Sequence, residues 1–187
     1  MLVPRTQTAI VQTNAKTSLP LAVSQSAPVP DLPFGRYVLV RVLAVALNPT
    51  DFKMVQHFPI PGHLAGCDFC GVVEKCGSEE IALAFPRGTR VCGAVFPYNP
   101  EQRQSGSFSQ WVIADADLIL KVPVHWNDLD AAALGGVGWG TAVLAFYDPE
   151  ALALQGIPTK PAVKNEPVLV YGGRTASGTM ACQLLRL

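Results

Sequence analysis

The sequence has few charged residues, no surplus of either sign and no long apolar run. Only 15% of its 187 residues are charged, and 14 lysines and arginines are balanced by 14 aspartates and glutamates. Because there is no basic surplus or basic stripe, nucleic acid is not expected as a partner. Hydrophobic residues make up 49% of the chain, enough for a buried core, which excludes the disordered class.

Signals for membrane insertion and secretion are lacking as well. No continuous apolar run approaches the length that a membrane-spanning helix needs. Residues 1–18 contain no apolar core followed by a cleavage site of small residues, so no secretory leader is expected. The five cysteines form an odd set, which favours free, buried thiols in a reducing compartment. These absences predict a cytoplasmic protein without membrane association.

Short strand-like segments separated by turn signals dominate the first two thirds of the chain. Val38, Val40 and Val42 alternate with other residues, which predicts a strand that ends before Asn48-Pro49. Residues 25–36 have the composition of a proline-rich connector. The spacing of the segments predicts a small β-rich barrel or sandwich. Further strands are expected at residues 9–11, 69–74, 89–95, 108–114 and 118–122.

From residue 127 onward the pattern becomes helical. Asn127 with Asp130 three positions later is typical of a helix start. The apolar segment that follows, residues 131–147, contains four glycines, each costing about 1 kcal/mol relative to alanine inside a helix. We therefore expect a break in the helix, or a close approach by another backbone or by a ligand.

Residues 167–187 have the order of a strand, a glycine-rich turn and a helix. Gly173, Thr175 and Gly178 occupy the three positions of the dinucleotide-binding fingerprint. The hydroxyls of Thr175 and Ser177, the charge of Arg174 and the amides at the helix start all suit a phosphate. The alternative is an ordinary strand-to-helix turn rich in small residues, and the turn alone does not decide between the two.

Two other stretches carry chemically useful side chains. Lys53 follows the expected strand end at Asn48 and is suited to bind phosphate, hold a substrate carbonyl or donate a proton; the alternative is a solvated surface lysine. Asp51 is expected either to pair with a basic group or to cap the next turn. Cys67 and Cys70 have a metal-ligand spacing but lie in a strand-like segment without a second cysteine pair, so no metal site is expected.

Taken in order, these motifs resemble the medium-chain dehydrogenase/reductase superfamily. Residues 48–51 (NPTD) stand where zinc-dependent alcohol dehydrogenases have C-x-T-D, and residues 66–71 (GCDFCG) stand where they have G-H-E-x-x-G. Asn48 and Cys67 replace two zinc ligands, and the four-cysteine structural lobe is absent, so the resemblance is to the zinc-free branch. Further landmarks follow in order at residues 88–91, 106–111, 130–134 and 141–142.

Within that branch, the stretches YGGRTAS and NPTDFK are similar to fungal trans-acting enoyl reductases. The resemblance implies an α+β fold: a GroES-like β-rich catalytic barrel (residues 1–126), a connecting helix and linker (127–166) and the first βα unit of an incomplete Rossmann domain (167–187). Relatives would continue for roughly 150 more residues, because a doubly wound domain needs about six strands. The chain is therefore expected to be truncated, to bind NADPH poorly by itself and to have a loosely packed end.

The resemblance also implies a function. Such an enzyme reduces the α,β-unsaturated acyl chain held by a partner polyketide synthase, or by a polyketide synthase–peptide synthetase hybrid, with NADPH as cofactor, and we expect a monomer. Lys53 would stabilise the enolate oxygen and Thr141 would share the catalytic site; Phe58 stands near where some relatives carry a proton-donating tyrosine. Alternatives are a zinc-free quinone oxidoreductase acting on free small molecules and a non-catalytic fragment that binds the synthase. The resemblance assigns cofactor binding to Thr50, Asp51, Phe52, Lys53, Arg174, Thr175, Ala176 and Ser177, and substrate binding to Thr141, Ala142, Val143, Leu144, Ala145, Phe146, Tyr147 and Asp148, with no metal ligand.

Overall fold

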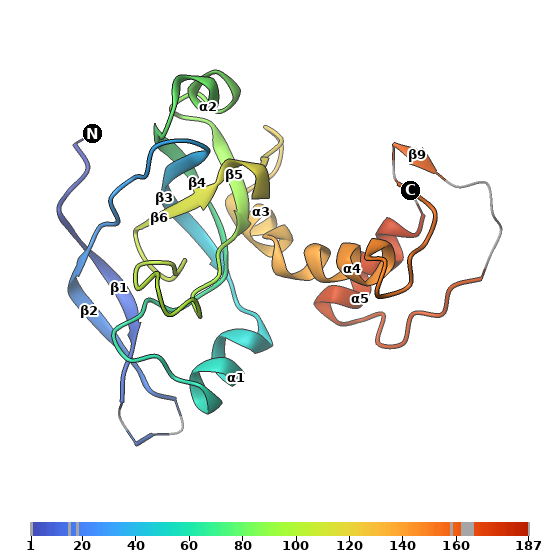
Figure 1. The fold of residues 1–187 in the computed structure, drawn as a ribbon, viewed down its shortest axis with the longest axis horizontal. Coiled ribbons are helices and arrows are strands. Elements are labelled where there is room, and N and C mark those ends of the chain that lie inside the picture. Colours follow the sequence, from blue (N-terminus) through green and yellow to red (C-terminus); the bar gives the residue numbers. More distant parts are fainter. Residues whose placement is uncertain (1, 15, 18, 158, 162–166, 187) are drawn as a thin grey trace. The chain divides into compact units, whose positions relative to one another are not determined.

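A five-stranded antiparallel sheet forms the centre of the first part of the chain (Figure 1). The computed structural model describes residues 2–14, 16–17, 19–157, 159–161 and 167–186. They divide into two units, residues 1–136 and 137–187. In chain order the elements are β1 (Thr6–Gln12), β2 (Leu21–Pro28), β3 (Tyr37–Ala46), α1 (Pro49–His57), β4 (Asp68–Cys76), α2 (Glu79–Ala84), β5 (Arg90–Ala94), β6 (Trp111–Asp115), the 3-10 turn η1 (Ala116–Leu118), β7 (Ile119–Lys121), α3 (Asp128–Leu134), α4 (Val137–Tyr147), β8 (Gly156–Ile157), β9 (Lys160–Pro161) and α5 (Ala176–Leu184).

The strand order in the sheet is β6-β3-β4-β5-β7, and each neighbouring pair is antiparallel. The hairpin of β1 and β2 lies beside this sheet and is joined to it through loops: the Ile10 amide donates to the Phe108 carbonyl (2.8 Å), and Ala9 pairs with Ser109. In the first unit, the strands expected from alternation and turn signals are all present. Strand β2 was missed, because half of it was assigned to the proline-rich connector. Pro28 is tolerated because it ends the strand, where its carbonyl accepts a bond from the Gln7 side chain (3.1 Å).

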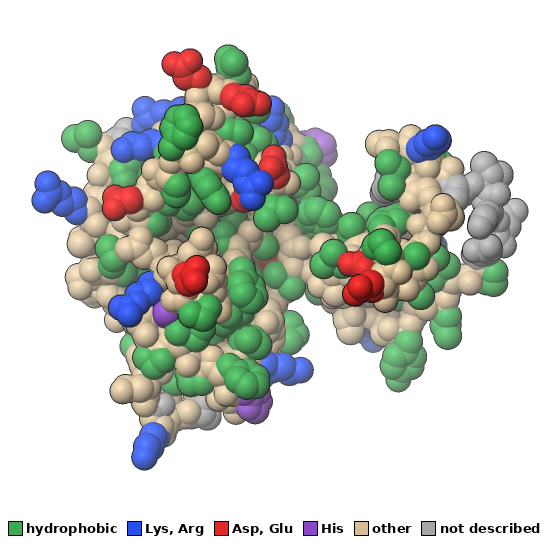
Figure 2. Space-filling view, viewed as in Figure 1, with side chains coloured by type: hydrophobic (Ala, Val, Ile, Leu, Met, Phe, Trp, Pro, Cys, Tyr) green, Lys and Arg blue, Asp and Glu red, His purple; other side chains and the backbone are tan. Residues whose placement is uncertain are grey.

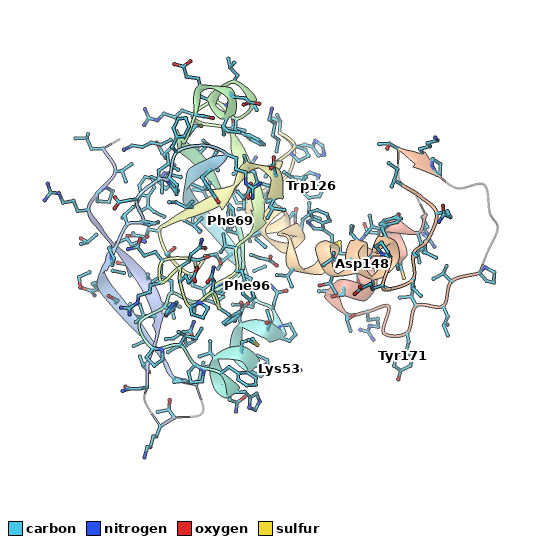
Figure 3. All side chains as sticks on the ribbon, in the orientation of Figure 1. Lys53, Phe69, Phe96, Trp126, Asp148 and Tyr171 are labelled. Carbon is cyan, nitrogen blue, oxygen red and sulfur yellow. The ribbon has the colours of Figure 1, made fainter. Side chains whose placement is uncertain are left out.

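Both faces of the central strand β4 are covered. Phe69 is fully buried in a cluster of valine, alanine and isoleucine side chains from β3 to β7 (Figure 3). The next residue, Cys70, points to the opposite face, because successive side chains alternate across a strand. There it packs with Cys92, Ala131 and Ala132, so helix α3 covers the second face. The core of the first unit therefore has two layers, and both β4 and β5 contribute side chains to each of them. The first cluster consists of Val38, Val40, Phe69, Val73, Val91, Val112, Ala114 and Ile119.

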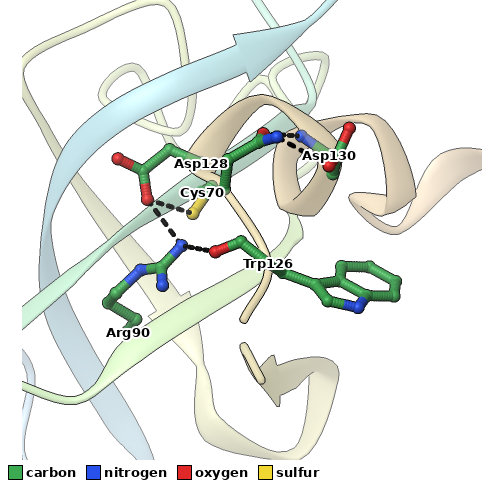
Figure 4. Close-up of polar contacts among 6 residues, drawn as sticks. Cys70, Arg90, Trp126, Asp128 and Asp130 are labelled. Carbon is green, nitrogen blue, oxygen red and sulfur yellow. Dashed lines mark hydrogen bonds and ion pairs between the residues drawn. The ribbon is translucent and has the colours of Figure 1, made fainter. Parts of the chain in front are cut away.

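A polar joint fixes the start of α3 against the sheet (Figure 4). Nη2 of Arg90 donates to the Trp126 carbonyl (2.8 Å) and to Oδ1 of Asp128 (2.7 Å). Oδ1 of Asn127 accepts from the Asp130 amide (2.8 Å), which confirms the helix start expected from the sequence. The Cys70 thiol lies beneath this joint, and burial, with the charge of Asp128 in addition, raises its pKa to about 11.

The glycines after α3 break the helix, as expected. Gly135 ends α3 with φ of +42°, and a Cβ atom there would lie 2.4 Å from Cγ of Asp68. Counted as one stretch, residues 128–147 are long and apolar enough to cross a membrane by length and composition alone, so the expectation that no segment approaches that length was wrong. In the structure this stretch is two helices, and Ala131 and Ala132 in the first of them are buried in the core.

In the second unit, helices α4 and α5 pack together through Ala142, Phe146 and Ala181. The expected strand at residues 168–171 is absent, which corrects the sequence interpretation. A strand needs a neighbour to pair its backbone groups, and no other strand in the described part of this unit pairs with these residues. Leu169 and Tyr171 are 92% and 100% exposed. Val170 nevertheless packs against the cluster of α4 and α5, and α5 is packed as well, so the expected loose packing of the whole end is not observed.

Candidate functional site

Helix α1 presents the first group of expected site residues. The sequence interpretation treated NPTDFK as a loop after a strand, but Pro49 begins a helix. Proline suits the first helical position, where its missing N–H costs nothing. Oδ2 of Asp51 accepts from the Asn48 amide (2.7 Å), so this carboxylate caps the helix, one of the two roles expected for it.

The side chains of this first helical turn differ in accessibility. Phe52 and Lys53 are exposed on α1, where Figure 3 labels Lys53, and both are open to a ligand. Asp51 is buried at 6% exposure, and burial raises its pKa. Its Oδ1 atom accepts no hydrogen bond of good geometry from the described residues, although the Cys67 thiol is near enough to act on it electrostatically. Burial, strengthened by Asp51, raises the pKa of Cys67, which stays a neutral thiol.

Tyr98 supports the first turn of α1, a role that the sequence interpretation missed. Its hydroxyl donates to the Thr50 carbonyl (2.9 Å), and the side chain is 6% exposed. Burial, strengthened by Cys67 and Asp51, raises the pKa of this phenol. Its ring packs edge-on against exposed Phe96, with 5.6 Å between ring centres. No motif marks Tyr98 in the sequence; its only signal is its place just after a strand end.

Asp68 holds the segment that precedes α1 and the turn that follows α3. Its Oδ2 accepts from Nδ2 of Asn48 (2.8 Å), and its Oδ1 accepts from the Gly136 amide (3.0 Å). Asn48 and Cys67 stand in the positions of zinc ligands. Asn48 instead donates to Asp68, and Cys67 lies near the carboxylate of Asp51. Among the described residues, no group of three or more histidine, cysteine or acidic side chains could hold a metal ion.

The glycine-rich turn of the second unit leads directly into α5 and is closely packed. Gly172 has φ of +83°, and a Cβ atom at Gly178 would lie 2.2 Å from the Gly172 carbonyl oxygen, so close packing requires glycine there. The Thr175 hydroxyl donates to the Gly172 carbonyl (2.8 Å) and accepts from the Gly178 amide (3.1 Å). Thr175 is therefore the cap of α5, and its hydroxyl proton is already used within the turn. Arg174 and Ala176 are exposed.

The expected substrate-binding residues, Thr141–Asp148, lie in helix α4 and in the residue that follows it. Thr141, Leu144 and Ala145 are exposed, whereas Ala142 and Phe146 are buried against α5. The Thr141 hydroxyl donates to the Val137 carbonyl one turn earlier (2.6 Å). Asp148 accepts from the Glu150 amide (2.8 Å) in the turn that ends the helix. The expected phosphate-binding residues Arg174–Ser177 and substrate-binding residues Thr141–Asp148 thus belong to the second unit, whereas Thr50–Lys53 belong to the first.

On the face shown in Figure 2, basic and acidic side chains are interspersed over the first unit.

Residues 35–124 match the family model of the alcohol dehydrogenase GroES-like domain. This part of the chain therefore has the GroES-like domain of the alcohol dehydrogenases. This finding confirms the expected fold class.

Curated relatives that match this chain are trans-enoyl reductases. The trans-enoyl reductase calK of Penicillium decumbens is 57% identical over 190 residues, covering 97% of this chain and 51% of the relative. The trans-enoyl reductase sthE of Phaeosphaeria nodorum is 49% identical over 188 residues, covering 100% of this chain and 51% of the relative. By sequence, the chain is similar to trans-enoyl reductases from fungi. It spans about half the length of the curated relatives it matches.

Solved structures of other proteins have the same fold. An alcohol dehydrogenase superfamily protein from Novosphingobium aromaticivorans superposes with a TM-score of 0.73 at 25% identity, over 95% of this chain and 49% of its own. A mycobacterial protein complexed with NADPH superposes with a TM-score of 0.67 at 22% identity, over 95% of this chain and 49% of its own, which shows the fold alone.

Proposed function

We propose that the protein carrying this chain is an NADPH-dependent, trans-acting enoyl reductase of secondary metabolism. It reduces the α,β-unsaturated acyl chain held by a partner polyketide synthase or polyketide synthase–peptide synthetase hybrid, in the cytoplasm and as a monomer. The observation that carries the proposal is 57% identity to a trans-enoyl reductase across 97% of the chain, both units included.

The glycine-rich turn fits the diphosphate of a nicotinamide cofactor. The left-handed Gly172 and the tightly packed Gly178 shape a turn that opens α5, and the amides of Ala176 and Ser177 lie in its first turn. A helix N-terminus favours an anion, and exposed Arg174 adds a positive charge. In this proposal Arg174–Ser177 hold the phosphates and Thr50–Lys53 line the nicotinamide. When bound, NADPH supplies the hydride that is added to the β-carbon of the thioester.

Lys53 is proposed to supply the charge that this reaction needs. Negative charge develops on the thioester oxygen in the transition state, and a fixed cation stabilises it. The Lys53 side chain is exposed and stands on a helix whose first turn is held by Asp51 and Tyr98. Thr141, whose hydroxyl proton is directed to its own helix, is proposed to accept rather than donate a hydrogen bond. Exposed Leu144 and Ala145 would contact the acyl chain, together with the rest of the segment to Asp148.

The test is reduction of an enoyl thioester of N-acetylcysteamine, followed by loss of NADPH absorbance. Two proteins are compared: this chain, and a chimera in which the remaining half of the Penicillium decumbens relative follows residue 187. We expect Lys53→Met to lower kcat of the active protein about 100-fold, as loss of an oxyanion-stabilising group does. Lys75→Met removes an exposed lysine elsewhere on the first unit and should leave kcat unchanged.

The alternatives predict different results in the same assay. Reduction of free quinones without reduction of any enoyl thioester would replace the proposal with a quinone oxidoreductase. Failure of both proteins to bind NADPH would favour a synthase-binding module without catalysis. Equal kcat for Lys53→Met and the unchanged protein would remove Lys53 from the mechanism.

A further inference from the structure

Asp68 lies in the stretch GCDFCG, but the sequence interpretation assigned it no role. We propose that Asp68 is a positioning residue: through Asn48 it holds the first turn of α1, and with it Lys53, in fixed register with the turn at Gly135 and Gly136. The kinetic part of this proposal rests on the proposed function, whereas its structural part does not.

The geometry joins three segments through one carboxylate. Asp68 is the first residue of β4 and is 2% exposed. Its two oxygens point to different donors, Nδ2 of Asn48 at 2.8 Å and the Gly136 amide at 3.0 Å. A planar, two-oxygen acceptor on a rigid strand fixes the direction of each donor. Because movement of either segment would leave a part-buried donor without its acceptor, both segments are held against Asp68.

The turn at Gly135 is built around this side chain. A Cβ atom at Gly135 would overlap the carboxyl group of Asp68, and the residue has φ of +42°. Glycine is therefore required there for two reasons: side chains rarely adopt this backbone conformation, and the space is filled by the carboxylate. The backbone after α3 consequently lies directly against Asp68, which makes the aspartate the common support of both segments.

From Asn48 the connection continues into α1. The backbone amide of Asn48 donates to Asp51 in the first turn of the helix (2.7 Å). Asn48 thus contacts Asp68 through its side chain and α1 through its backbone. Lys53 follows two residues after Asp51 on the same helix, so Asp68 is proposed to act on Lys53 through Asn48 and the helix.

Exchanging the two partners tests the proposal. Asn48→Asp places two carboxylates in contact in a buried site, Asp68→Asn removes one acceptor oxygen, and the double variant restores a donor–acceptor pair with its direction reversed. Glu74→Gln is the matched control, because it changes another acid of β4 whose partners are Arg41 and Arg87. The structural readout is hydrogen exchange of the α1 amides Lys53–Val55 in this chain.

We expect Asn48→Asp to accelerate exchange in α1 by about 10-fold or more, and the double variant to return it to within about threefold of the unchanged chain. Glu74→Gln should leave exchange in α1 unchanged. If Asn48→Asp does not fold, Asp68→Asn and the double variant decide: we expect faster exchange in the single variant and recovery in the double. Exchange in the double variant as fast as in the singles, or equal acceleration by Glu74→Gln, would overturn the proposal.

A second readout separates positioning from general loss of stability. In the enoyl reduction assay with the chimera, we expect Asn48→Asp to lower kcat about 10-fold or more with less than a threefold change in KM for NADPH, and the double variant to recover kcat. A parallel loss in Glu74→Gln would contradict this. If the unchanged chimera reduces no enoyl thioester, the proposed function fails, while the exchange experiment still decides the role of Asp68.

Discussion

Replacing Phe69 by alanine is expected to destabilise the first unit more than any surface change. The ring is fully buried where side chains from five strands meet, and its removal leaves a cavity that valines on several strands cannot fill together. Phenylalanine-to-alanine changes in such cores cost about 3–5 kcal/mol. For a unit of 136 residues this corresponds to a fall in melting temperature of about 10–17 °C.

Thermal unfolding followed by tryptophan fluorescence measures this loss, since Trp111 is buried in the same unit at 4% exposure. Phe34→Ala is the matched control, because Phe34 is 90% exposed and its loss should change stability by no more than about 0.5 kcal/mol. A loss below about 1 kcal/mol for Phe69→Ala, or one no larger than that of the control, would mean that the two-layer core described above does not carry the stability of the unit.

Three further predictions concern the turn, the thiols and an ion pair. Gly178→Ala should destabilise α5 by about 1–3 kcal/mol, because the new Cβ would overlap the Gly172 carbonyl. Gly140→Ala should stabilise α4 by up to about 1 kcal/mol, because the space around Gly140 is open. Hydrogen exchange in the second unit measures both effects. Iodoacetamide at about pH 8 should label exposed Cys182 first, and the buried thiols of Cys67, Cys70 and Cys92 should react only on unfolding. Mass spectrometry measures the labelling. Rapid labelling of a buried thiol would contradict the burial of these cysteines in the core. Burial raises the pKa of Glu74, but its two arginine partners outweigh burial and hold the pKa below its usual value. The ionised carboxylate therefore contributes to the free energy of unfolding above the unfolded pKa of about 4.3, and this contribution is lost as the pH falls through the folded pKa. Glu74→Gln should remove this part of the acid dependence of unfolding.

The strands of the first unit could be predicted because burial on one or both faces leaves a pattern in the sequence. Strand β2 gave no such pattern, since most of its residues are exposed, including the apolar Ala22 and Val23. The apolar residues 168–171 gave a clear pattern without a strand, because pairing depends on a neighbour that local sequence does not contain.

The candidate site was predictable only in part, for a similar reason. Motifs pointed to Lys53 and to the turn at Gly172–Gly178, whose chemistry is local. Asn48-Pro49 was interpreted only as the end of a strand, although the same proline begins α1. The roles of Asp68 and Tyr98 depend on partners 20 and 48 residues away, and no local pattern indicates such pairs.

The shared central strand also restricts which changes in length this protein can accept during evolution. Phe69 and Cys70 serve different layers, so deleting or inserting one residue in β4 would send each following side chain to the wrong layer. β4 already has a register shift against β3, between Val73 and Lys75, so a further change in length would fall in a strand that is paired on both sides. Insertions and deletions in related genes should therefore avoid residues 68–76 and gather in exposed loops such as residues 99–105, a pattern that comparison of coding sequences can test.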